Sequence, residues 1–389
     1  MNMDVVEGFE PSRLKSLLEH LGTIEDPRDP WRVAHPLNEV LFLVVCATIC
    51  DCEDYDIISD WGEERIDFLR RYLPYEHGVP GGRWLTILMN RIEPALFSAA
   101  FTGWVRETWP DKPEFVAIDG KTSRRSHDRA LGKAPLHLVS AYATTAGLVL
   151  GQEAVAEKSN EITAIPALLD RLGEAGGLKG ATVSIDAIAT NPAIAQKILD
   201  QGADYLLAVK ANQPTLRAEV EAYFADAPEE VMETLIETDK GHGRIEERVI
   251  TVSADANWLQ SDRRFPGELR MPGVTSLIRV CSTAHTGEGR RGDTRYFIAS
   301  GTPDARTAAH AVRGHWLIEN ALHWVLDVVF KDDLSRIRKG HGAHNMAIVR
   351  HFAINLVRAV RDKRSLKARR KRAAFSIQYL EQILGSLAN

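Results

Sequence analysis

The stretch EFVAID, residues 114–119, marks the point where the sequence changes from helical to strand-like patterns. It is a short apolar run that ends in an aspartate, a form that is common for buried strands. A second stretch of the same form, ATVSID, occupies residues 181–186. Two strands of this kind predict a buried sheet with a carboxylate at the end of each.

Strand-like and helical runs alternate around these two stretches. Two of the strands meet at Ala146–Gly147, a turn sequence that predicts a β-hairpin. The order of strand, strand, strand, helix, strand, helix, strand, helix predicts an α/β fold with a sheet of mixed pairing. The runs are the strands 114–119, 136–145 and 148–156, the helix 161–172, the strand 181–186, a helix from Asn191–Pro192, the strand 205–210 and a helix from Pro214.

The rest of the chain differs in pattern from this α/β region. The N-terminal part reads as helical throughout, with Pro36 at the first position of a helix that buries the apolar run Val40–Cys50. After the α/β region come strand-like runs, and then a helix that begins with Thr302 as its N-cap residue. We therefore divide the chain into a helical region 1–110, an α/β part 111–232, a β-rich part 233–301, a helical part 302–362 and a basic tail 363–389.

The composition is that of an ordinary globular protein. The chain has 389 residues, of which 44% are hydrophobic and 26% charged, enough for a sizeable core in two or three domains. The longest apolar run is about half of what a bilayer requires, and the acidic N-terminus does not resemble a signal peptide. We therefore expect a cytoplasmic protein without a membrane span, in which Cys46, Cys50 and Cys52 are reduced core thiols.

Charge is distributed unevenly along the chain. The net charge is −5, yet nine of the fifteen residues from Arg358 to Arg372 are Lys or Arg. A smaller basic group, which includes Lys121, Arg124 and Arg125, follows the first strand of the α/β region. Such a run is either a solvated helix face or a surface that contacts phosphates, and the sequence pattern leaves both interpretations open.

Three carboxylates are candidates for chemistry. Asp119 and Asp186 end strands, and if these strands are neighbours their side chains lie close enough to share Mg²⁺, which prefers oxygen ligands. Glu319 lies on a helical stripe with His315, His323 and Asp327. The alternatives are structural caps for the two aspartates and a hydrogen-bonded polar seam for the stripe. A zinc site at the two histidines is a further alternative, although no HExxH motif is present.

The chain contains several long motifs, among them AIDGKTSRRS (117–126) and RGHWLIENALHWVLDVVFKDD (313–333). These motifs resemble the H-repeat-associated transposases, which are insertion-sequence transposases of the DDE type. The resemblance covers roughly residues 12–360 and implies a ribonuclease-H-like catalytic fold, interrupted by a β-rich insertion and preceded by an all-α N-terminal domain. It also implies that Asp119, Asp186 and Glu319 form the catalytic triad. The other motifs that carry it include LHLVSAYATTAGLVLGQ (136–152), YLLAVKANQPTL (205–216) and GHGRIEERVI (241–250).

Under this resemblance the activity is metal-dependent cleavage at transposon ends followed by strand transfer into target DNA. Two divalent ions, Mg²⁺ or Mn²⁺ in its place, are implied, about 3.5–4 Å apart. The implied partners are DNA and further copies of the chain on DNA, with the protein bound to the nucleoid. Trp258 is either a base-stacking residue or, more in keeping with its type, a core residue. The implied DNA contacts are Lys121, Arg124, Arg125, His242, Arg244, His315, Arg336, Arg338, Lys339 and the basic block 358–372.

Some motif positions depart from the family pattern. The sequence after the second aspartate is AIATN (187–191), where relatives usually have a Met-Gly-Cys-Gln type of sequence. Of the Tyr-Arg-Glu-Lys signature in the broader group, only the glutamate is present, and Val312, His315 and Leu326 stand at the other positions. Three hypotheses therefore stay open: an active transposase, a decayed or domesticated transposase that binds DNA without cutting it, and a nuclease of this fold without strand transfer.

Overall fold

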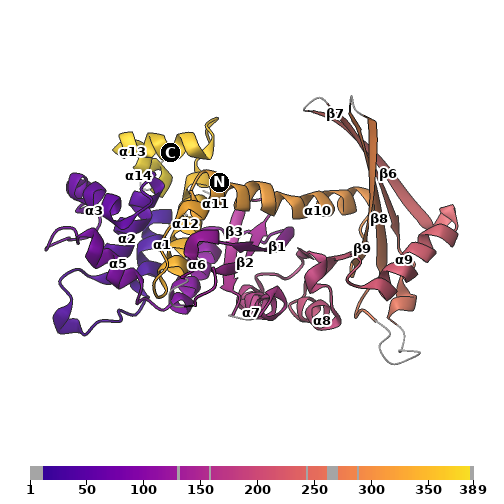
Figure 1. Ribbon diagram of the computed structural model, residues 1–389, viewed down its shortest axis with the longest axis horizontal. Helices are drawn as coiled ribbons and strands as arrows, with labels where there is room; N and C mark the ends of the chain where they lie inside the picture. Colours follow the sequence, from indigo (N-terminus) through magenta and orange to yellow (C-terminus); the bar gives the residue numbers. More distant parts are fainter. Residues whose placement is uncertain are drawn as a thin grey trace, which may run out of the picture.

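The computed structural model describes residues 12–128, 132–156, 159–241, 244–260, 270–286 and 289–385. The molecule is elongated, with a helical part at one end, an α/β part in the middle and a β-rich part at the other end (Figure 1). Among the described residues, no helix is both long enough and apolar enough to cross a membrane. Cys46, Cys50 and Cys52 are free and buried, as the sequence predicted.

The N-terminal part is all-helical, as predicted. Its central helix α2 is apolar on every side and is buried between the others, from Val40 to Cys50 without a gap. Pro36 takes an extended backbone conformation and caps this helix, so α2 begins one residue later than the sequence predicted. The helices are α1 Arg13–Gly22, α2 Leu37–Ile49, α3 Tyr55–Glu64, α4 Ile66–Leu69, α5 Gly82–Met89 and α6 Pro94–Thr108, with the short turn η1 Pro30–Arg32.

The middle part contains the predicted mixed sheet. Its first five strands lie in the order β3-β2-β1-β4-β5, in which β1, β4 and β5 are parallel and β2 and β3 are antiparallel. This is the ribonuclease-H-like arrangement that the sequence predicted. The strands are β1 Phe115–Thr122, β2 His137–Ala143, β3 Leu148–Ala154, β4 Thr182–Ile185 and β5 Asp204–Val209, and the helices between them are α7 Glu161–Gly173, α8 Pro192–Asp200 and α9 Pro214–Asp226.

Local sequence signals explain where several of these elements begin. Gly147 has a φ of 71° in the turn between β2 and β3, a conformation that glycine adopts without strain. Asn191 caps α8 by accepting a hydrogen bond from the backbone N–H of Ile194, and Pro192 takes the first helical position. The hairpin and this helix were both predicted from these residues.

The β-rich part is a set of long antiparallel strands that continues the same sheet. The strand β9 pairs with β5, so the sheet reaches nine strands in one order from β3 to β6. Three of its four strands were predicted, whereas β6, with the sequence METLIETDKG, was not recognised individually. The strands are β6 Met232–Gly241, β7 Arg244–Ser253, β8 Ser276–Thr286 and β9 Gly289–Ala299, with the short turns η6 Glu229–Val231 and η7 Asn257–Leu259.

A long helical run returns from the β-rich part across the sheet to the helical end (Figure 1). Asp304, rather than the predicted Thr302, caps it, because the Asp304 carboxylate accepts a hydrogen bond from the backbone N–H of Thr307. The run comprises α10 Ala305–Leu317, the π-helical turn η8 Ile318–His323 and α11 Trp324–Val328. It is followed by η9 Asp332–Leu334, α12 Gly342–Ala359, α13 Leu366–Phe375 and α14 Ile377–Leu384.

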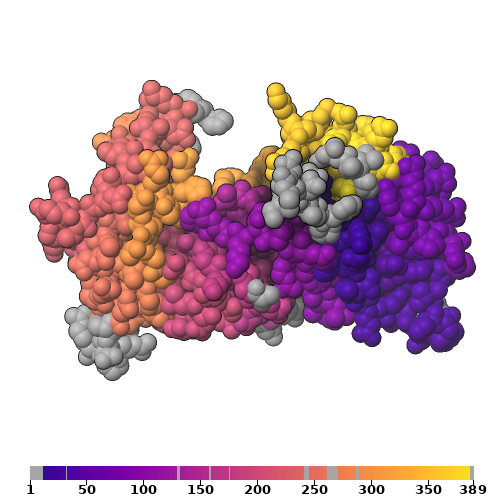
Figure 2. All heavy atoms as spheres, turned by 180° about the vertical axis from the view of Figure 1, so that it is seen from behind, coloured from indigo at the N-terminus to yellow at the C-terminus, as the bar shows by residue number. Residues whose placement is uncertain are grey.

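The basic C-terminal segment is folded rather than a tail. In Figure 2, α13 and α14 (yellow) lie against the N-terminal helices (indigo and purple). Arg370 of α13 is buried, where it pairs with Glu53 and stacks over the ring of Phe330. The neighbouring Arg369 is also largely buried and pairs with Asp362. Arg370 holds the segment to the helical part, whereas the pair of Arg369 is internal to the C-terminal segment. Both arginines are used inside the protein, which corrects the idea that the whole block 358–372 contacts phosphate.

Candidate active site

Asp119 and Asp186 lie side by side because their strands are neighbours. In the parallel pair β1 and β4, Ile118 is the partner of Ile185, and an aspartate follows each of them. Phe115 of β1 packs under α10. Because side chains alternate along a strand, Asp119 faces the same side of the sheet as Phe115, the side that α10 crosses.

Glu319 reaches the two aspartates from the helical run. It lies in the π-helical turn η8, where the backbone N–H of Trp324 donates to the carbonyl of Glu319 five residues earlier. Such turns are rare and occur frequently at functional sites. Asp119, Asp186 and Glu319 line one cavity of about 440 Å³. The structure therefore brings the three predicted carboxylates together.

Asp119 is the most buried of the three. Its side chain is 17% exposed, and burial together with the negative charge of Glu319 raises the pKa of Asp119 to about 7. Among the described residues, the only basic side chain within 4.0 Å of Asp119 or Glu319 is His323. A carboxylate pair in this state is relieved either by a proton or by a cation from outside the chain.

Asp186 differs because a lysine already neutralises it. The Nζ atom of Lys210, at the end of β5, lies 2.6 Å from Oδ1 of Asp186. Burial acts to raise the pKa of Asp186, but the hydrogen bonds from Lys210 and from the backbone N–H of Ala187 hold it below its usual value. Asp186 therefore has a cation of the chain as its partner, unlike Asp119 and Glu319.

The chemistry of the donor atoms fits a divalent ion. Asp119, Glu319 and His323 each offer one ligand atom, and these atoms all lie within 4.8 Å of one another. We call these three residues the open cluster. Two carboxylates and an imidazole are a suitable ligand set for a divalent cation, and the described part of the chain provides no lysine or arginine to take the place of one.

His315 lines the same cavity, one helical turn before Glu319. Its Nδ1 atom lies 3.2 Å from Oγ of Ser184 in β4, and burial lowers the pKa of the imidazole below its usual value. His315 is therefore neutral near pH 7. It lies where a DNA phosphate could approach Asp186, but it offers a hydrogen bond rather than a charge.

Lys121 does not have the exposed position that we expected for a DNA contact. Its side chain is 10% exposed, and its Nζ atom lies 2.7 Å from Asp327, 3.3 Å from Asp332 and 3.6 Å from Asp333. Arg350, which is also buried, pairs with Asp332. We call Asp327, Asp332 and Asp333 the closed cluster, because lysine and arginine side chains of the chain already neutralise it.

The other predicted basic residues form one surface. Arg124 and Arg125 in the turn η2 (Arg124–Ser126) are exposed, and Nε of Arg338 donates to the backbone carbonyl of Arg125. Arg336 and Lys339 are exposed on the same segment as Arg338. We call these five residues the basic surface. It begins five residues after Asp119 in the sequence.

Three further predicted residues lie in the β-rich part. His242 lies outside the described residues, and Arg244 begins β7, although its side chain is not described. Trp258 is half-buried, stacks on Tyr223 and packs against the core of the sheet. The core interpretation of Trp258 is therefore the one that the structure supports.

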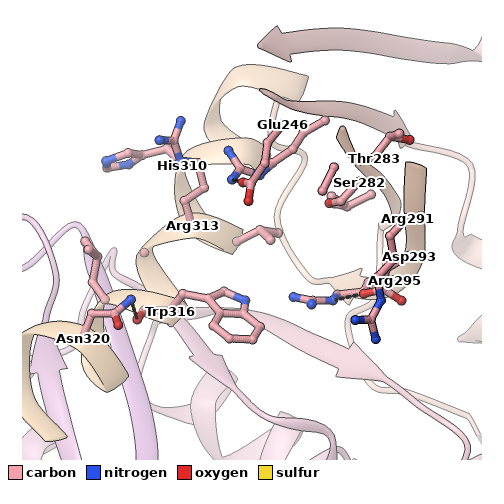
Figure 3. Close-up of a pocket in the computed structure, with 17 residues that line it drawn as sticks. Glu246, Ser282, Thr283, Arg291, Asp293, Arg295, His310, Arg313, Trp316 and Asn320 are labelled. Atoms are coloured by element: carbon pink, nitrogen blue, oxygen red, sulfur yellow. Dashed lines mark hydrogen bonds and ion pairs between the residues drawn. The ribbon is translucent and has the colours of Figure 1, made fainter. Parts of the chain in front are cut away.

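A groove beside the cavity was missed in the sequence. It lies between α10 and the strands β7, β8 and β9, has a volume of about 1090 Å³ and is lined by Arg248, Arg291, Arg295 and Arg313 (Figure 3). Trp316 of α10 points into it, is 50% exposed and lies under the guanidinium of Arg295. We call it the α10 groove. The signal for this groove in the sequence was Trp316, a tryptophan three residues before Glu319.

Comparisons with known proteins place the chain in a family. It matches the family model for the DDE_Tnp_1-associated region over residues 18–105 and the model for the transposase DDE domain over residues 110–356. A solved piggyBac transposase synaptic complex with hairpin DNA is also similar, with a TM-score of 0.41 at 10% identity, covering 97% of this chain and 79% of that one.

Curated relatives match over almost the whole length. The chain is 38% identical to "Putative transposase YncI" of Escherichia coli O157:H7, covering 96% of this chain and 95% of the relative. It is 36% identical to "H repeat-associated putative transposase YhhI" of Escherichia coli K12, covering 95% and 98%. "Inactive transposase YbfQ" of the same strain is 42% identical over 17% of this chain and 80% of its own length. The chain therefore belongs to the transposase family with this DDE domain and its associated N-terminal region, among the H-repeat-associated members.

Proposed function

We propose that this protein is an active DDE transposase with Asp119, Asp186 and Glu319 as its catalytic carboxylates. It cuts the phosphodiester at the ends of its element and joins the freed 3′ ends to target DNA. One observation carries the proposal: carboxylates from two neighbouring strands and from the crossing helical run line one cavity, and two of them have no lysine or arginine partner among the described residues.

The carboxylates hold divalent metal in this proposal. A metal ion bound there lowers the pKa of the attacking water and stabilises the charge on the leaving 3′ oxygen. Asp119 is the most buried of the three carboxylates that line the cavity. Asp186 would contribute a carboxylate oxygen to the ion, and Lys210, which pairs with it at 2.6 Å, would supply a positive charge beside the phosphate.

DNA reaches the cavity along two positively charged surfaces. The basic surface lies beyond the end of β1, and the α10 groove shares Asp293, Arg295 and Trp316 with the cavity. Arginines in a groove follow the phosphate backbone, and an exposed tryptophan offers a face on which an unpaired base stacks. Because two transposon ends are cut, we propose that the protein acts as a homo-oligomer on DNA.

A second candidate is a decayed transposase that binds DNA without cutting it. Two observations favour it. Asp186 is already paired with Lys210, so this carboxylate is not free. Val312 and Leu326, at the positions of the family's tyrosine and lysine, are buried and cannot reach DNA.

The test uses the DNA that flanks the gene. Duplexes that carry its terminal inverted repeats are incubated with the full chain and MgCl₂ or MnCl₂, and nicked and joined products are separated on denaturing gels. We expect cleavage by the wild type, none by Asp119→Asn, and wild-type cleavage by Asp226→Asn, an exposed aspartate at the end of α9.

The outcomes separate the three hypotheses. Cleavage by Asp119→Asn at the wild-type rate would contradict the assignment of the site. Specific, salt-sensitive binding without cleavage would establish the decayed transposase. Cleavage without products joined to a second duplex would establish a nuclease.

A further inference from the structure

His323 is the one member of the open cluster that the DDE triad leaves without a role. It is the last residue of the π-helical turn η8, four residues after Glu319. Its Nδ1 atom points at both carboxylates, 3.4 Å from Oε2 of Glu319 and 3.7 Å from Oδ2 of Asp119. The imidazole therefore faces the two carboxylates that have no lysine or arginine partner in the described part of the chain.

The burial of His323 costs free energy, because one of its ring nitrogens has no hydrogen-bond partner among the described residues. The residue is 5% exposed, and its Nε2 atom is buried without a hydrogen-bond partner. A buried polar atom without a partner costs free energy, and most buried polar side chains avoid it. Imidazole binds metals in its neutral form through one ring nitrogen, and Nδ1 is the ring nitrogen that faces the carboxylates.

The distances are those of ligands that share one ion. Two ligand atoms that are each about 2.1 Å from a cation, at angles between about 90° and 120°, lie roughly 3.0–3.6 Å apart. The separations of Nδ1 from Glu319 and Asp119 fall at the upper end of this range or just above it. A small contraction of the cluster around an ion brings both into it.

The charged groups near His323 do not occupy the side of the ring on which Nδ1 faces the two carboxylates. Lys121 and Asp327 approach from the closed cluster, but they pair with each other at 2.7 Å. The π-helical turn holds the backbone of Glu319 and of His323 in one element, so both side chains reach the same point. If the imidazole only filled space in the core, there would be no reason for two carboxylates at 3.4 and 3.7 Å from its Nδ1 atom.

We propose that His323 supplies a nitrogen ligand, through Nδ1, to the divalent ion that Asp119 and Glu319 hold. This inference rests on the proposed function, since that function places the ion there. Mg²⁺ takes oxygen ligands almost exclusively, whereas first-row transition ions accept imidazole. The site therefore prefers Mn²⁺ to Mg²⁺, and His323 is the source of the preference.

The test measures the bound metal rather than activity. The full chain, freed of metal by chelation, is titrated with Mn²⁺ alone and followed by electron paramagnetic resonance, and Mg²⁺ is added in competition. Electron spin-echo modulation then reports nitrogen bound to Mn²⁺, and protein labelled with ¹⁵N-histidine shifts this signal without any substitution. The variants are His323→Gln and Asp119→Asn, with His315→Gln on the same helical run as the matched control for His323.

We expect histidine nitrogen on Mn²⁺ in the wild type and in His315→Gln, and none in His323→Gln. We also expect Mn²⁺ affinity to fall roughly 10–100-fold in His323→Gln, with a much smaller change for Mg²⁺. If His323→Gln fails to fold, the ¹⁵N experiment on the wild type still shows whether a histidine binds Mn²⁺, and a signal retained in His315→Gln excludes His315.

Other outcomes overturn different parts of the account. Mn²⁺ that depends on Asp119 but shows no histidine nitrogen overturns the role of His323 and leaves the proposed function standing. A nitrogen signal lost in His315→Gln instead overturns the assignment to His323. If no Mn²⁺ binding depends on Asp119, both this inference and the metal site of the proposed function are wrong.

Discussion

The open cluster and the closed cluster take most of their residues from one stretch of the chain, 319–333, and they differ in what balances their charge. Lys121 and Arg350 enter the closed cluster, and these arginine and lysine charges hold the pKa of Asp332 below its usual value although burial acts to raise it. No lysine or arginine of the described residues enters the open cluster, and the pKa of Asp119 rises to about 7. Burial acts to raise the pKa of both carboxylates, so the cations that the fold supplies to Asp332 account for the opposite results.

The difference separates a structural cluster from a functional one. The closed cluster joins β1 to α12 and η9 through ion pairs, so it holds Asp119 and Glu319 in their relative positions. In the open cluster the negative charges of Asp119 and Glu319 repel each other, and a cation from outside the chain is needed to balance them. Acidic groups of similar composition can thus be distinguished by the cations that the fold supplies to them.

The largest expected effect comes from neutralising one carboxylate in each cluster. Glu319→Gln removes a metal ligand and should lower cleavage of end DNA at least about 10³-fold. Asp333→Asn removes a carboxylate that already has Lys121 and Arg124 as partners, and should lower cleavage less than about tenfold. Initial rates on the same duplex measure both, and equal losses would break the comparison.

The next effect concerns stability. Arg350→Met leaves Asp332 buried with one cation fewer, and the free energy of unfolding should fall by about 3 kcal/mol or more. Arg336→Met, in the exposed part of the preceding segment, should change it by less than about 0.5 kcal/mol. Urea denaturation followed by circular dichroism provides the values. An unchanged stability in Arg350→Met would show that the closed cluster holds nothing together.

In the open cluster, removing a charge should raise the free energy of unfolding rather than lower it. Asp119→Asn removes repulsion, so in the absence of metal it should raise the free energy of unfolding by roughly 1–3 kcal/mol at pH 8. The pKa of Asp119 is raised on folding, so the wild-type carboxylate destabilises the fold fully above about pH 7. This cost is lost as the pH falls toward the unfolded pKa, and the gain should disappear near pH 4.

The measurement is denaturation in a chelating buffer at pH 8, 6 and 4, for the wild type, Asp119→Asn and the control Asp226→Asn. A destabilised Asp119→Asn at pH 8 would mean that Asp119 has a stabilising partner, which would remove the basis for calling the cluster open.

The smallest expected effect distinguishes a basic side chain that is paired inside the protein from one that contacts DNA. Arg336→Gln should leave stability unchanged, weaken DNA binding and reduce the slope of log K against log salt by about 1. Lys121→Gln should lower stability but leave that slope unchanged, because its charge is used inside the protein. Binding titrations at several salt concentrations test both, and a reduced slope for Lys121→Gln would return Lys121 to the DNA surface.

Much of the fold followed from local sequence signals. The hairpin at Ala146–Gly147 and the cap at Asn191–Pro192 are turn and helix-start signals that act within a few residues. The end of β4 was predicted to within one residue, because an apolar run closed by an aspartate is also local. The end of β1 was wrong, because β1 continues past Asp119 to Thr122, where β2 pairs with its last residues. The strand β6 was missed because its polar, alternating sequence forms a strand only when β7 pairs with it.

The site was less accessible to prediction, since long-range contacts determine the state of each charge. The sequence showed that Lys121 follows Asp119, but not that three carboxylates from residues 327–333 surround it. It showed YLLAVK as a strand, but not that Lys210 meets Asp186. The stripe of His323 and Glu319 was visible, whereas the π-helical turn that directs both toward Asp119 was not.

The most direct test of the open and closed clusters is anomalous diffraction at the manganese edge, from crystals of the full chain soaked in MnCl₂. The account predicts a peak in bonding contact with Asp119, Glu319 and His323, and no peak among Asp327, Asp332 and Asp333. A peak at the closed cluster, or full-occupancy manganese away from Asp119, would contradict it.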